Sequence, residues 1–138
     1  MPPRDSQRTK VYRAQEQLPK GKHLKTMAEM QAYVDEIHST RWFQKRWFRP
    51  HNIKVKDGRG RTSAGAYWGR ITMPKWSRYE IYILHEIAHL MPKGVTYAVA
   101  SHGREFVKNF IALLEWKMKV NPRPVFREYR VKWHPKRT

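Results

Sequence analysis

The sequence predicts a single α+β domain, with three main helices and a small, mainly antiparallel sheet. Apolar residues recur at helical spacing in three segments, and two short segments alternate apolar with polar residues as half-buried strands do. The chain has 138 residues, of which 40% are hydrophobic. That length and composition fit one hydrophobic core.

The first 25 residues are polar, basic and interrupted by three prolines. Such a segment is typical of an arm that is poorly ordered or lies over a domain surface. We therefore expect a basic N-terminal arm over 1–25 and a single domain over 26–138. The end of that domain, about 121–138, reads as a basic tail.

The first helix is expected to begin at Thr26, where Thr26 and Glu29 form a capping box. A segment at 41–51 then interleaves aromatic and basic residues, a mixture that can stack on bases while contacting phosphates. Its aromatic residues also fall at helical spacing, which favours packing in the core. The apolar positions of these two segments are Met27, Met30, Val34 and Ile37, then Trp42, Phe43, Trp47 and Phe48.

Two strands are expected next. Ile53 and Val55 alternate with lysines, and the Asp57-Gly58 pair that follows is a strong turn signal. A second strand is expected over 66–73, with Tyr67, Ile71 and Met73 on one face. The glycines here lack the spacing of a phosphate loop and indicate turns or bulges; they are Gly58, Gly60, Gly65 and Gly69.

A second capping box, Ser77 with Glu80, predicts a helix from about Arg78 to Met91. This helix carries His85-Glu86-Ile87-Ala88-His89. Residues four apart share one helix face, so both imidazoles can reach one metal ion, and H-E-x-x-H is a zinc signature. Glu86 sits beside the metal without sharing that face, a position that suits a general base acting on water.

Catalytic zinc usually has three protein ligands. A third histidine six residues after His89 is excluded, because Val95 stands there. His102 and Glu105 remain as candidates. We favour His102, since Glu105 lies three residues along and can either orient it or simply serve as a first-turn acid favourable to the helix dipole.

Ser101 is expected to cap the helix that contains His102 and runs through Met118. After Asn121-Pro122 ends that helix, a short strand is expected. Its residues in phase are Val125, Tyr129, Val131 and Trp133. Elsewhere in the chain, His51 follows Pro50 and is expected at the surface.

The chain has 29 Lys and Arg against 11 Asp and Glu, a formal charge of +18, and no cysteine. The charge favours a polyanionic partner such as nucleic acid, although it also fits a role in solubility. The sequence lacks the apolar run of a signal peptide and any segment of membrane-spanning length. We expect a cytoplasmic protein in a reducing compartment, with no membrane partner.

H-E-I-A-H, then S-H-G-R-E-F, resembles the SprT-like zinc metallopeptidases of the minigluzincin type, whose fold is zincin-like. The preceding G-A-Y-W-G-R-I-T-M-P adds to this resemblance, which covers about residues 60–115. It is closest to the short H-E-x-x-H metallohydrolases of bacteriophages and actinobacteria. DNA-linked members often carry a cysteine-rich zinc ribbon, which this chain lacks, so the resemblance does not supply DNA binding.

The resemblance implies one catalytic zinc ion bound by His85, His89 and His102, with Glu86 as the base. A peptide or protein substrate would pair with the strand near 66–73, and Tyr97 or Arg104 could stabilise the oxyanion. Two alternatives remain. One is a nucleic-acid-associated basic protein, including a protease directed to proteins on DNA; the other is a zinc-stabilised module without activity.

Overall fold

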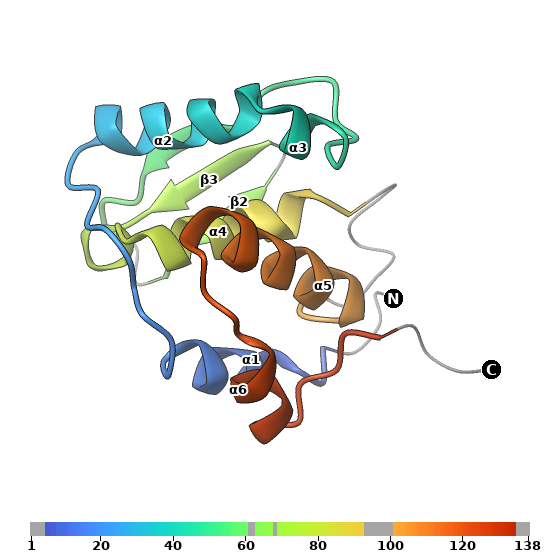
Figure 1. The fold of residues 1–138 in the computed structure, drawn as a ribbon. Helices are drawn as coiled ribbons and strands as arrows, with labels where there is room; N and C mark the ends of the chain where they lie inside the picture. Colours follow the sequence, from blue (N-terminus) through green and yellow to red (C-terminus); the bar gives the residue numbers. More distant parts are fainter. Residues whose placement is uncertain (1–4, 61–62, 68, 93–100, 135–138) are drawn as a thin grey trace. The chain divides into compact units, whose positions relative to one another are not determined.

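The computed structural model describes residues 5–60, 63–67, 69–92 and 101–134 (Figure 1). Within these ranges it contains six α-helices and a three-stranded sheet, so the α+β class is confirmed. The chain divides into two compact units, one of Lys20–Met91 and one of Met1–Pro19 together with Pro92–Thr138. None of the helices in the described ranges combines the length and apolar character needed to cross a bilayer.

The sheet belongs to the unit Lys20–Met91 and consists of β1 (Lys54–Asp57), β2 (Gly65–Tyr67) and β3 (Arg70–Met73). Its order is β1-β3-β2, with β1 parallel and β2 antiparallel to β3. The sheet is therefore mixed, and the prediction of a mainly antiparallel sheet is wrong. The expected strand over 66–73 is interrupted at Gly69, whose φ of 74° suits glycine. The two parts, β2 and β3, pair with each other, and β3 pairs with β1 along its other edge.

The helices of this unit are α2 (Met27–Ser39), α3 (Arg41–Gln44) and α4 (Glu80–Leu90), with the short 3-10 helix η1 (Lys75–Ser77) before α4. Helix α2 packs on β1, and α4 packs on β2 and β3. In Figure 1 the strands lie between α2 and α4. The core side chains with no exposed surface include Met30, Val34, Ile37, Phe43, Ile71, Met73, Ile83, Leu84 and Ile87.

The start of α2 and the aromatic segment over 41–51 were both predicted from the sequence. Thr26 caps α2 as predicted, because its Oγ1 accepts the N–H of Glu29 at 3.0 Å. The aromatic segment follows the predicted core packing only in part. Phe43 is fully buried, whereas Phe48 is 50% exposed and Trp47 is half-buried.

The second unit contains α1 (Arg8–Gln15), α5 (Arg104–Leu113), the π-helical turn η3 (Leu114–Met118) and α6 (Arg123–Glu128). The N-terminal segment contains a helix that the sequence analysis did not predict. It forms α1, which packs on α6. Val11 and Ala14 are fully buried, because their helical spacing places both on one face of α1.

Helix α6 replaces the strand expected in the tail. Pro124 stands in the first turn of α6, where its missing N–H costs nothing, and the Asn121 side chain accepts the N–H of Arg123 at 3.2 Å. Phe126 then faces the core, fully buried, with its ring 6.1 Å from that of Phe110 and 6.4 Å from that of Trp133.

Candidate metal centre

Helix α4 presents the H-E-x-x-H residues on a well-supported backbone. Ten of its eleven residues are buried, and only His89 is half-buried. His85 is 2% exposed and Glu86 is 6% exposed. The rings of His85 and His89 lie side by side with their centroids 5.0 Å apart, as the four-residue spacing predicts.

The start of α4 is held by the carboxylate of Glu80, which is 9% exposed. It accepts the backbone N–H of Lys22 at 2.7 Å and the hydroxyl of Tyr33, on α2, at 2.8 Å. Burial, together with the hydrogen bond to Glu80, raises the pKa of Tyr33 well above its ordinary value. The carboxylate also lies in the first turn of α4, where the helix dipole favours negative charge.

The predicted capping box of Ser77 and Glu80 does not form, so that prediction is wrong. Tyr79 is the N-cap of α4 and makes no side-chain capping bond, and α4 begins two residues later than expected. The hydroxyl of Ser77 donates instead to the carbonyl of Pro74 at 2.8 Å, within the turn that contains η1. Because the carboxylate of Glu80 is engaged by α2 and Lys22, it does not complete a local box.

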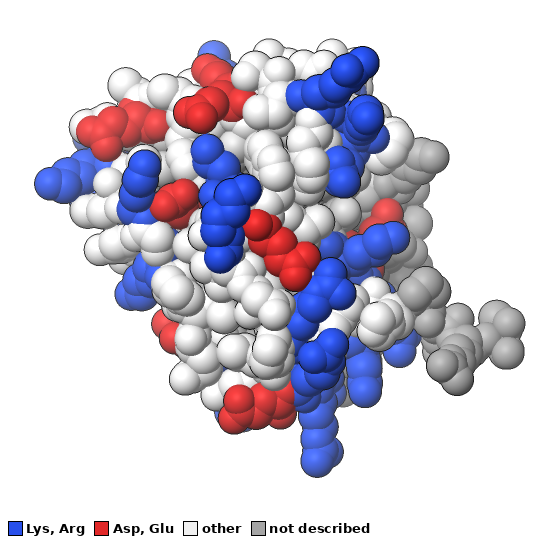
Figure 2. Space-filling model, in the orientation of Figure 1, with Lys and Arg blue, Asp and Glu red and all other residues white. Residues whose placement is uncertain are grey.

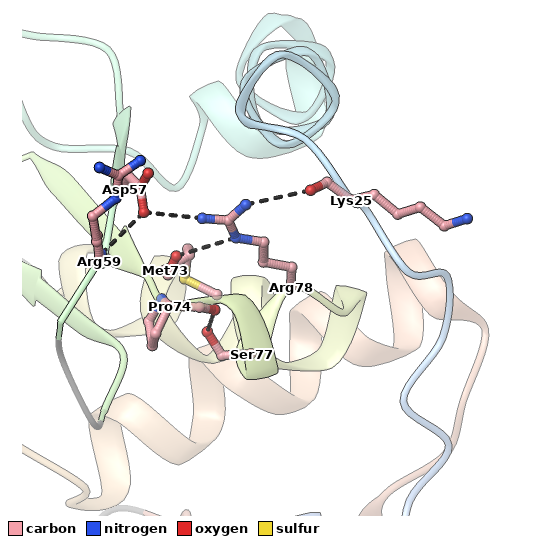
Figure 3. A network of polar contacts seen from close by, with 7 residues as sticks. All are labelled: Lys25, Asp57, Arg59, Met73, Pro74, Ser77 and Arg78. Carbon is pink, nitrogen blue, oxygen red and sulfur yellow. Dashed lines mark hydrogen bonds and ion pairs between the residues drawn. The ribbon is translucent and has the colours of Figure 1, made fainter.

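The side chain of Arg78, two residues before α4, binds three neighbouring segments of the chain (Figure 3). Its guanidinium is buried and donates to the carbonyls of Met73 and Lys25, each at 3.3 Å, and to Asp57 Oδ1 at 3.1 Å. These acceptors lie at the end of β3, before α2 and at the end of β1. One side chain thus ties three segments of the unit to the residue two positions before the start of α4.

His102 lies in the turn before α5, not in the first turn of that helix as expected. Gly103 is the N-cap of α5, without a side-chain bond, so the predicted cap by Ser101 is wrong. The His102 ring is buried, and its Nδ1 lies 2.7 Å from Oδ2 of Asp5. Nothing in the sequence indicated Asp5 as a partner of His102, and Glu105 was one possible orienting residue.

The structure brings together the three histidines predicted as ligands. One ring nitrogen of each of His85, His89 and His102 lies within 4.8 Å of the others, close enough to bind a metal ion. Two nitrogens bound tetrahedrally to zinc at ~2.0–2.1 Å are about 3.3 Å apart.

Burial shifts the pKa of Glu86 and of His102 in opposite directions. It raises the pKa of Glu86 from 4.5 to about 8. It also lowers the pKa of His102, although the hydrogen bond to Asp5 opposes this. The neutral imidazole that results is the form that binds a metal.

The remaining candidates from the sequence are placed as follows. Glu105 and Arg104 lie in the first turn of α5, and both are half-buried. Tyr97 and Val95 fall outside the described residues. His51 is exposed, as predicted, and its carbonyl accepts the indole N–H of Trp47 at 3.0 Å.

Comparisons with models of protein families, with curated proteins and with solved structures give no match to this chain. The family resemblance described above therefore stays a prediction from the sequence motifs.

Proposed function

We propose that this protein is a zinc-dependent metallopeptidase of the SprT-like, minigluzincin type, with a zincin-like fold. The observation that carries the proposal is the convergence of ring nitrogens of His85, His89 and His102 within 4.8 Å, with the buried Glu86 as the next residue after His85 on α4. Three neutral imidazoles are a donor set that suits zinc, and they leave a fourth position for water or substrate. A zinc ion bound there would polarise a peptide carbonyl and make a coordinated water more acidic.

Glu86 is the proposed general base. It follows His85 on α4, and burial raises the pKa of its carboxyl in the metal-free protein. A zinc ion bound by the neighbouring histidines would favour the ionised carboxylate, which is the form that acts as a base. Its carboxylate removes a proton from the attacking water while the water oxygen bonds to the peptide carbonyl carbon. Glu86 then gives this proton to the amide nitrogen, the C–N bond breaks, and a carboxylic acid and an amine leave.

The sheet supplies a place for an extended substrate. In the described residues β2 (Gly65–Tyr67) pairs only with β3, so its other edge can accept a peptide by strand addition. The substrate was expected to pair with the strand over 66–73. Because β3 is paired on both sides, only β2, the first described part of that range, can accept a peptide. Helix α4 packs on both of these strands, so a peptide on this edge would run beside the helix that carries Glu86.

The test uses the full chain loaded with zinc and an unstructured protein substrate, with mass spectrometry of the products. Glu86→Gln should keep zinc and reduce cleavage by at least ~10²-fold, the ordinary contribution of a general base. Removing zinc with a chelator should abolish cleavage, and adding zinc should restore it. A Glu86→Gln variant that cleaves at the wild-type rate would contradict the assignment, and zinc binding without any cleavage would favour the structural zinc module.

Nucleic-acid association is the second candidate, favoured by the charge of +18. Figure 2 shows Lys and Arg spread over one face with Asp and Glu among them. Two exposed aromatic side chains, Trp76 at 52% and Phe48 at 50%, could stack on bases. Binding through charge predicts that affinity for single-stranded DNA falls steeply with salt, and no binding at low salt would exclude this candidate.

A further inference from the structure

The buried ring of His102 is held on several sides within its own unit. Its ring centroid lies 5.2 Å from that of Tyr12 and 5.0 Å from that of Phe106. Asp5 holds the ring edge: Oδ2 lies 2.7 Å from Nδ1, and Oδ1 accepts the backbone N–H of His102 at 3.3 Å. One carboxylate therefore contacts both the side chain and the backbone of this ligand.

Asp5 is itself held in place by Gln7, two residues along. The Gln7 side chain is 7% exposed, and its Nε2 donates to the carbonyls of His102 and Lys132, each at 3.0 Å. The backbone N–H of Lys132 donates back to Gln7 Oε1. The segment that carries Asp5 is thus fixed against His102 by a second buried side chain, so the position of the carboxylate does not depend on one contact.

A carboxylate is only an acceptor, so the nitrogen facing Asp5 must carry the ring proton. In a neutral imidazole the other nitrogen then has a free lone pair. From this we infer that Asp5 is a positioning residue for the third metal ligand. It holds His102 in the Nδ1–H tautomer, so that Nε2 is the atom that binds the metal. This inference rests on the proposed metal centre and not on peptidase activity.

The effect on affinity follows from general behaviour of such partners. A carboxylate that receives the second N–H of a ligating histidine fixes the ring and raises its basicity, and losing it usually costs ~10- to 100-fold in metal affinity. Asp5→Ala should therefore weaken zinc binding by about that factor. Asp5→Asn keeps an acceptor oxygen but no charge, so its loss should be smaller than that of Asp5→Ala.

The experiment measures Zn²⁺ affinity of the full chain by competition with a chromophoric chelator. Asp35→Ala is the matched control, because it removes an exposed acid from α2 whose carboxylate accepts a hydrogen bond from the side chain of Gln31. Nitrogen NMR of His102 in the metal-free chain reads the tautomer directly, and circular dichroism checks that each variant is folded. We expect the Nδ1–H form in the wild type and a mixture of tautomers in Asp5→Ala.

Two results would overturn the inference. One is an Asp5→Ala variant that binds zinc as tightly as Asp35→Ala. The other is weaker zinc binding with an unchanged His102 tautomer and no advantage of Asp5→Asn over Asp5→Ala, which would show a purely structural contact. A wild-type chain that binds zinc through His102 but cleaves no peptide would remove the peptidase proposal while leaving the role of Asp5 intact.

Discussion

The buried carboxyl of Glu86 should destabilise the metal-free protein as the pH rises. Burial raises its pKa from 4.5 to about 8, whereas the unfolded chain keeps the ordinary value. Between these two values the unfolded state is ionised while the folded state retains its proton. The contribution of Glu86 is therefore most favourable below the unfolded pKa and is lost as the pH rises through the folded pKa. Glu86→Gln removes this titration.

The size of the effect follows from the two pKa values. The interval between 4.5 and about 8 corresponds to at most ~5 kcal/mol, at ~1.4 kcal/mol per pH unit. Between about pH 5 and about pH 8 the change amounts to ~3 kcal/mol, because part of the titration is already complete at the lower pH. Glu86 is 6% exposed, so little solvent screening reduces this value.

The assay is urea unfolding of the metal-free wild type and Glu86→Gln at these two pH values. The stability of the variant relative to wild type should rise by ~3 kcal/mol from the lower to the higher pH. Glu128→Gln, an exposed site on α6, is the control and should show no such change. Parallel pH profiles for wild type and Glu86→Gln would refute the reasoning and would mean that the folded carboxyl titrates normally.

Two further predictions concern stability. Tyr33→Phe removes the 2.8 Å hydrogen bond to the buried Glu80 carboxylate and should cost ~1.5–3 kcal/mol in urea unfolding, whereas Tyr129→Phe should cost under ~0.5 kcal/mol; equal losses would contradict the role of this bond. Burial lowers the pKa of His38, whose ring lies tilted at 5.5 Å from that of Phe43, so its neutral form contributes stability that is complete above the ordinary pKa of ~6.5 and lost below it. His38→Phe should therefore be less sensitive than wild type to acidification below about pH 6.5, and an unchanged acid profile would oppose this.

Local signals in the sequence predicted the local parts of the candidate metal centre. The spacing of His85 and His89 fixes their shared face on any helix, and Pro92 correctly marks the end of α4. His102 was predicted because catalytic zinc usually has three protein ligands, so a third was sought after His85 and His89. Asp5 could not be found in this way, because 97 residues separate it from His102 and no local pattern links an isolated acid to a distant imidazole.

Errors in the fold arose where two periodicities competed or where pairing was not local. Val125 and Val131 fit an alternating pattern, yet Pro124 in a first helical turn was the stronger signal, and α6 formed. The turn at Asp57-Gly58 exists, since Asp57 Oδ1 accepts the N–H of Arg59 at 3.0 Å, but β1 pairs in parallel with β3 and not with the next strand. Strand order depends on contacts across the whole unit, which turn residues do not encode.

The bonds from Gln7 to Lys132 and from Asp5 to His102 span 125 and 97 residues. During synthesis Asp5 and Gln7 leave the ribosome long before their partners, whereas all the residues of Lys20–Met91 emerge as one continuous piece. That piece can fold first, with His85 and His89 already on their helix. The contact of Asp5 with His102 can form only after His102 has emerged, so a nascent chain that ends before this residue carries two of the three candidate ligands. The proposed activity therefore requires synthesis to pass His102, and the Gln7 bonds that hold the segment of Asp5 require Lys132 as well.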